Sequence, residues 1–266
     1  MADETNTILF LAIVALGAAV QTVTGFAMGL VIMTGVALFG IADISFAAAV
    51  VSLVSMVNAA VALRRGYRHI DWHYVRAMIS GLIPLMFVGL WLLDYLSTNN
   101  YGVLRLLLGM VIVTAGTLLM ISPAPFAARS SVAATVACGT LGGVLTGLYS
   151  AGGAPLAYFM YRQPIGIDTI RFTLLTVFGL TTATRSFMIG VTGQLSWDIL
   201  LVAAVSVPVV VSMTVGFTRL TPMIPDRIVR VLVFIVLLLS GMVLIAESIY
   251  ESDFSIQSVS QYLPNL

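Results

Sequence analysis

The chain has 266 residues, of which 60% are hydrophobic and 9% are charged. An ordinary soluble domain has roughly 25% charged residues, and the mean hydropathy of this chain is +1.08. A membrane-spanning helix needs about 20 apolar residues, so this length has room for at most about ten crossings. The composition therefore excludes a large soluble domain, a nucleic-acid binder and a disordered regulator.

Arg, Asp, Pro and Asn residues divide the chain into apolar runs. The runs extend over residues 7–40, 44–63, 74–96, 103–121, 130–161, 169–190, 197–218 and 227–248. All but two have the length of a single span, which predicts an all-α membrane protein. The runs 7–40 and 130–161 would exceed the hydrocarbon thickness as straight helices at about 1.5 Å per residue. We therefore expect each to be a broken or re-entrant helical hairpin.

The two long runs are interrupted near their middle by residues that favour irregular backbone. The interruptions are Gln21–Phe26 in the first run and Thr146–Pro155 in the second. Glycine lowers the cost of unusual backbone angles, and Pro155 has no backbone N–H to donate. We expect two helical arms around an unwound tip in each run.

The order of a long run followed by three spans occurs twice in the chain, at an offset of roughly 125 residues. Residue pairs that keep this register are Thr24 with Thr146, Gly25 with Gly147, Trp72 with Trp197, Pro84 with Pro208, Arg105 with Arg230 and Gly116 with Gly241. The set indicates a duplication. We predict a first repeat at 1–125, a second at 126–250 and a C-terminal tail at 251–266.

The Arg residues predict the orientation of the repeats, since short cytoplasmic loops hold the positive excess. Ten of the twelve lie near one set of loops, at positions 64, 65, 68, 76, 129, 162, 171, 219, 227 and 230. With these loops inside, each long run enters and leaves on the same side, and both termini are on the exterior side. The second repeat is then inverted relative to the first, which is typical of secondary transporters.

The two tips are the leading candidates for a binding site, because unwound backbone at membrane depth must line a cavity or be buried in protein. Backbone N–H groups at the starts of half-helices favour an anionic substrate. The tip residues that we expect to bind it are Gln21, Thr22, Thr24, Gly25, Phe26, Tyr149, Ser150, Ala151, Gly152 and Gly153. The spacings Gly25-x-x-x-Gly29 and Gly143-x-x-x-Gly147 are equally typical of close helix packing.

Two polar residues inside other spans are further candidates. Arg185 lies about five residues from the exterior end of its span, where it can face the anion as a counter-charge or reach the outer headgroups. Asn58 can contribute to the site or form an interhelical hydrogen bond.

The sequence has no clear carboxylate in the middle of a span, which argues against a cation pathway and a carboxylate proton relay. It has no hydrolase triad, phosphate-binding loop or HExxH motif, so we predict no catalytic residues, metal site or cofactor. His69, Asp71 and His73 fit a solvated loop better than a metal site. Positive and neutral donors without buried carboxylates favour an anion.

The segment Gly147-Leu-Tyr-Ser-Ala-Gly-Gly-Ala-Pro-Leu, its counterpart Thr24-Gly-Phe-Ala-Met-Gly and the two-fold repeat resemble the TauE/SafE family. The resemblance covers about residues 8–248. It implies a multi-pass transporter of the bacterial cytoplasmic (inner) membrane that moves sulfite, sulfoacetate or a related sulfonate, often as an exporter.

From these observations we predict a secondary transporter that moves a small organosulfur anion by alternating access. Its expected partners are that anion and the lipid bilayer, with a coupling proton or ion and a second copy of the chain as candidates. A passive anion channel, a carrier of a small carboxylate and a structural subunit are the alternatives, the last disfavoured because it needs no duplicated broken helices.

Overall fold

The computed structural model describes residues 4–64, 66–120 and 126–220. Its regular structure in these ranges is entirely helical, which confirms the predicted all-α class. The helices are α1 (Glu4–Thr24), α2 (Met28–Phe39), α3 (Ile44–Leu63), the 3₁₀ turn η1 (Tyr67–His69), α4 (Trp72–Asn99), α5 (Tyr101–Met120), α6 (Val132–Tyr149), α7 (Gly153–Tyr161), α8 (Ile167–Val191) and α9 (Trp197–Leu220).

Six of the described helices are long and apolar enough to cross a membrane, namely α1, α3, α4, α6, α8 and α9. The protein is therefore a multi-pass membrane protein. The predicted span 227–248 and the predicted tail 251–266 lie outside the described residues.

The first long run forms two helices that fold back on each other. Gly17 of α1 packs against Met28 at the start of α2, whereas Ile13 packs against Gly35 near the end of α2. The helices are thus antiparallel across a short break, in which Ala27 has a left-handed backbone conformation with φ of 77°.

The second long run folds in the same way, with Ser150 left-handed at its break (φ 53°). At the break, Gly152 packs against Thr146 of α6. Farther from the break, the Cys138 thiol lies 3.5 Å from the carbonyl oxygen of Pro155, so α7 returns along α6.

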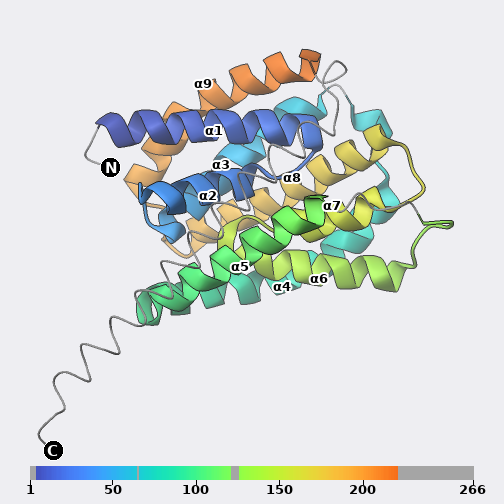
Figure 1. Ribbon diagram of the computed structural model, residues 1–266, viewed down its shortest axis with the longest axis horizontal. Helices are drawn as coiled ribbons and strands as arrows, with labels where there is room; N and C mark the ends of the chain where they lie inside the picture. The colour runs from blue at the N-terminus through green and yellow to red at the C-terminus, as the bar shows by residue number, and fades with distance from the viewer. Residues whose placement is uncertain (1–3, 65, 121–125, 221–266) are drawn as a thin grey trace, which may run out of the picture.

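The two hairpins enter the helix bundle from opposite ends (Figure 1). We call one end the N-terminal end, since it holds the start of α1 and the links 40–43 and 192–196. The other, which we call the Arg-rich end, holds the links 66–71, 126–131 and 162–166. The inverted-repeat relation between the two halves of the chain stays a prediction.

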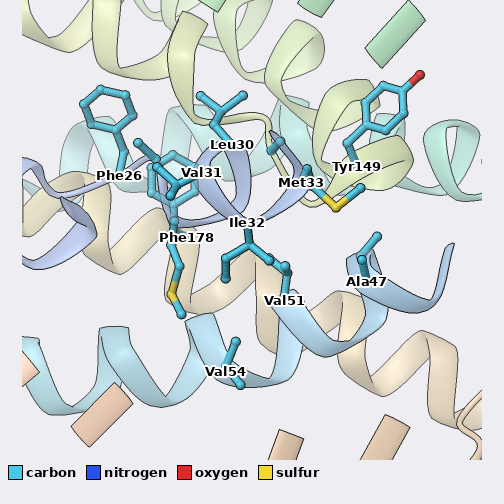
Figure 2. Packing of buried hydrophobic residues seen from close by; sticks show 14 of the residues in the cluster. Phe26, Leu30, Val31, Ile32, Met33, Ala47, Val51, Val54, Tyr149 and Phe178 are labelled. Carbon is cyan, nitrogen blue, oxygen red and sulfur yellow. The ribbon is translucent and has the colours of Figure 1, made fainter. Parts of the chain in front are cut away.

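Helix α2 lies in the centre of the bundle, in contact with α1, α3, α5 and α6. All residues from Met28 to Ala37 are buried, as expected of a helix that is apolar on every side. Figure 2 shows Ile32 of α2 directed toward Val51 of α3. This packing holds the start of α2, and with it the first tip, deep in the protein.

Helices α4 and α6 touch backbone to backbone along a line of glycines. A Cβ added to Gly139 would overlap with the carbonyl oxygen of Met78, and a Cβ added to Gly143 would overlap with that of Leu82. Gly147 faces the Met86 carbonyl oxygen in the same way. The small-residue spacing in α6 is therefore used for close helix packing.

Candidate functional site between the hairpin tips

The two hairpin tips meet in the interior of the bundle. Gly29, in the first turn of α2, lies against the backbone of Ser150, and an added Cβ would overlap with the Ser150 carbonyl oxygen. At the start of α7, Gly153 packs against the rings of Phe26 and Phe178. The two unwound segments thus form one junction.

A small space, which we call the tip cavity, lies at this junction. Its volume is about 20 Å³, which suits about one water molecule and is too small for a sulfonate. Its lining residues are Gln21, Ala27, Met28, Gly29, Leu30, Ser55, Ser150, Ala151, Gly153, Phe178 and Thr182. The described lining contains no charged side chain, so no carboxylate would repel an anion there.

Two helix N-termini, those of α2 and α7, open onto the tip cavity. The residues that precede them, Ala27 and Gly152, make no side-chain capping hydrogen bond. The first N–H groups of a helix lack partners within the helix and carry the positive end of its dipole. The cavity therefore has a positive potential and hydrogen-bond donors from two directions.

Gln21 contributes an amide that lines the tip cavity. Its side chain is only 3% exposed, and its Nε2 atom has no hydrogen-bond partner in the part of the chain that is described. A buried donor without an acceptor costs about 1–3 kcal/mol. This unpaired donor indicates that the cavity is built to receive an acceptor group.

Arg185 of α8 is fully buried beside this junction, which excludes the headgroup position within the structure. Its Nη1 donates to the carbonyl oxygen of Ala48 (2.6 Å) and to Ser52 Oγ (2.5 Å). Its Nη2 donates to the carbonyl oxygen of Gly147 at 3.2 Å. All of these acceptors are uncharged.

Two serine hydroxyls join Arg185 to the tip cavity. Ser52 Oγ lies 3.1 Å from Ser150 Oγ, and Ser150 lines the cavity. Because Ser52 Oγ donates its hydrogen to the Ala48 carbonyl oxygen (2.8 Å), the Ser150 hydroxyl is the donor to Ser52. The second tip is thus connected to Arg185 through one of its hydrogen-bond partners.

A larger cavity leads from the N-terminal end of the bundle to Arg185, and we call it the vestibule. Its volume is about 350 Å³, in the range of small-ligand sites. Its lining residues are Ser45, Phe46, Ala49, Leu90, Leu93, Asp94, Ser97, Arg185, Ile189, Gln194 and Ile199. Arg185 thus stands between the vestibule and the tip cavity.

The predicted site residues divide into two groups in the structure. Gln21, Ser150, Ala151 and Gly153 line the tip cavity, and Arg185 lies next to it through Ser52 and Ser150. These residues come from opposite halves of the chain, as the prediction of two meeting tips required.

The remaining predicted residues contact other groups. Thr22 Oγ1 donates to the Ala18 carbonyl oxygen and accepts a hydrogen bond from Asn58 Nδ2, which ties α1 to α3. Thr24 Oγ1 donates to the Val20 carbonyl oxygen, and the Tyr149 hydroxyl donates to the Leu104 carbonyl oxygen at 2.9 Å.

The other three predicted tip residues pack against the backbone or side chains of neighbouring segments. Gly25 lies against Arg171, and Gly152 fits against Gly142. Phe26 makes an edge contact with the ring of Tyr161.

The sequence analysis missed three hydroxyl residues of this region, Ser52, Ser55 and Thr182. Ser52, Ser55 and Asn58 are spaced three residues apart in an otherwise apolar helix, and Thr182 and Arg185 have the same spacing. Residues three apart share one helix face. A polar stripe of this kind within an apolar span could have identified these residues as site candidates.

The geometry described so far fits a carrier of small anions, and comparison with known proteins decides the family. The family described as "Sulfite exporter TauE/SafE" matches residues 9–244. The chain belongs to the TauE/SafE family. A Cupriavidus necator protein named "Probable sulfite/organosulfonate exporter TauE" is 38% identical over 238 residues, which are 90% of this chain and 93% of that protein.

Membership of the TauE/SafE family confirms that the chain is a membrane transporter and not an enzyme. The matched residues include both hairpin tips, Arg185 and the vestibule. Within the described ranges, no group of three or more His, Cys, Asp or Glu residues could hold a metal ion.

Proposed function

We propose that this chain exports sulfite or a small organosulfonate such as sulfoacetate across the bacterial cytoplasmic membrane by alternating access. The family and the name of the Cupriavidus necator relative support the substrate class and the direction. The binding site in this proposal is the tip cavity.

The observation that carries the proposal is that two helix N-termini and the unpaired Gln21 amide meet at a cavity without described carboxylates. Sulfite and sulfonate groups present three oxygens that accept several hydrogen bonds at once. In our proposal these oxygens bind the first N–H groups of α2 and α7, the Gln21 amide and the Ser150 hydroxyl. Charge-assisted hydrogen bonds to an oxyanion are about twice as strong as neutral ones.

The arrangement of the cavities supports one access state. If the Arg-rich end is cytoplasmic, as the positive-inside rule predicts, then the vestibule opens to the exterior and both chain termini are outside. The tip cavity, at about 20 Å³, is too small to hold the anion in this state. Transport then requires the tips to separate so that the cavity opens alternately to the cytoplasm and to the vestibule.

Thermal stabilisation of the purified protein tests the site. The panel is sulfite, sulfoacetate, isethionate, taurine, sulfate, acetate and phosphate, because a ligand that binds only the folded protein raises its stability. We expect sulfite or an organosulfonate to stabilise it selectively. Gln21→Leu should weaken that binding by about 2 kcal/mol, or roughly 30-fold, since it removes a donor to an anion.

Thr34→Val is the matched control for Gln21→Leu. Thr34 is a buried residue of α2 whose hydroxyl also has no hydrogen-bond partner in the described structure, but it does not line the tip cavity. This control should bind the anion as the wild type does. Equal losses in both variants, or no loss in either, would contradict the proposed site.

Flux from proteoliposomes separates the proposal from its alternatives. A carrier should show saturable sulfite or sulfoacetate efflux, and an imposed pH gradient reveals whether a proton is coupled to it. Unsaturable conductance would indicate a passive anion channel, and selective stabilisation by acetate would indicate a carboxylate carrier. The small volume of the tip cavity favours the carrier over a wide, continuous pore.

A further inference from the structure

Arg185 has a buried charge, and its hydrogen-bond acceptors in the described structure do not include a carboxylate. Its acceptors are the carbonyl oxygens of Ala48 and Gly147 and the hydroxyl of Ser52. Gly147 belongs to the last turn of α6, where the helix dipole is negative. These neutral partners hold the guanidinium in place but do not neutralise its charge, so it can still bind an anion.

The buried Arg185 side chain forms part of the vestibule lining. Arg185 is the cation in its described lining, and Asp94 is the carboxylate. Asp94 lies on the exposed outer part of α4, where its Oδ1 accepts a hydrogen bond from Gln194 Nε2 at 3.4 Å. The deep part of the vestibule is therefore positive and its mouth carries the negative group.

We propose that Arg185 forms a second anion-binding site at the floor of the vestibule, for the sulfite or sulfonate group that has left the tip cavity. This inference rests on the proposed function. In the present conformation the guanidinium is bound to carbonyl and hydroxyl oxygens. An anion in the vestibule replaces these acceptors, and the planar fork of Arg suits two oxygens of one oxyanion.

The serine pair gives this site a connection to the tip cavity. Ser150 lines that cavity and donates to Ser52, which is an acceptor for Arg185. When the second tip moves to release its anion, Ser150 moves with it and the set of acceptors around Arg185 changes. Arg185 thus becomes available to the anion on the vestibule side as the tip opens.

Charge-selective labelling of a single cysteine tests the second site without depending on transport. With Cys138→Ser as background, Ser45→Cys places a thiol in the vestibule lining, at an exposed position. The reagents are the anionic sulfonatoethyl methanethiosulfonate and its cationic trimethylammonium analogue. The measured quantity is the labelling rate of Ser45→Cys by the anionic reagent divided by its rate with the cationic one. We expect this ratio to be about tenfold higher with Arg185 than in Arg185→Gln, because a buried charge concentrates anions locally.

The matched control is Thr98→Cys, an exposed position near the end of α4 that does not line the vestibule. Its labelling ratio should be unaffected by Arg185→Gln. Arg185→Lys should retain most of the preference at Ser45→Cys, since it keeps the charge and loses only the fork. An unchanged ratio at Ser45→Cys in Arg185→Gln would overturn the inference.

Protection by ligand keeps the test decisive if Arg185→Gln does not fold. In the Ser45→Cys protein with Arg185 intact, sulfoacetate should slow labelling by the anionic reagent several-fold, whereas choline should not. No protection, or equal protection by both, would refute the second site. Failure of sulfite and sulfoacetate flux with intact charge preference and protection would refute the proposed function but not an anion site at Arg185.

Discussion

Ala27 and Ser150 turn the chain at the two hairpin tips, each in a left-handed backbone conformation. For residues other than glycine this conformation costs roughly 1–2 kcal/mol, because Cβ approaches a carbonyl oxygen. Both residues lie in the tip cavity lining. The strain is therefore concentrated at the segment that must move in our proposed mechanism.

Ala27→Gly should raise the stability of the protein by up to about 1 kcal/mol, because glycine adopts the left-handed conformation without this cost. The measurement is the thermal unfolding midpoint in detergent. The control is Ala37→Gly in the same helix, which should lower stability by about 1 kcal/mol, since glycine is unfavourable inside a helix. A lower midpoint for Ala27→Gly would contradict the strain at this tip.

At the scale of the elements, the contact between α2 and the second tip depends on a glycine. Gly29 brings the backbones of the two tips together, and no side chain fits between Gly29 and the Ser150 carbonyl oxygen. The half-helix α2 is held on every side by apolar packing. An atom added at Gly29 must therefore displace the second tip.

Gly29→Ala should weaken sulfite or sulfoacetate binding and lower transport by about tenfold, because overpacking costs typically 1–3 kcal/mol and changes the distance between the N-termini of α2 and α7. Calorimetric titration and proteoliposome flux measure the effect. Gly190→Ala in α8 is the control, since nothing lies within 4 Å of its added Cβ. Wild-type binding by Gly29→Ala would show that the tip junction does not shape the site.

For the whole molecule, a polar network joins three links at the Arg-rich end. Gln163 is its centre: its Oε1 accepts from the Tyr74 hydroxyl (2.9 Å) and from the backbone N–H of Ser130 (3.0 Å). Arg129 pairs with Asp71 at 3.2 Å beside it. The vestibule lies at the opposite, N-terminal end.

Gln163→Ala should loosen the Arg-rich end, because it leaves the Tyr74 hydroxyl and the Ser130 N–H without their common acceptor. We expect faster amide hydrogen exchange in residues 126–131 and 162–166, measured by mass spectrometry in detergent or nanodiscs. Gln194→Ala, an exposed glutamine at the opposite end, should leave this exchange unchanged. Unaltered exchange in Gln163→Ala would mean that other contacts close this end.

The amino-acid sequence by itself determined the membrane class, the positions of the helices and the two broken runs. Hydropathy and glycine content are local properties, and a bilayer requires every spanning segment to satisfy its own backbone. For this reason α3 occupies Ile44–Leu63 as the run 44–63 predicted. The second break, 150–152, falls within the predicted interruption, and the first, 25–27, ends one residue beyond it.

Only the tertiary structure decided which polar residues share a cavity. Thr22, Thr24 and Tyr149 were as plausible as Gln21 from their position in the chain, but each hydroxyl donates to a nearby carbonyl oxygen. Ser52, Ser55 and Thr182 joined the region from α3 and α8, because helix rotation and the meeting of the two tips set which faces converge. These are long-range packing relations that no local pattern encodes.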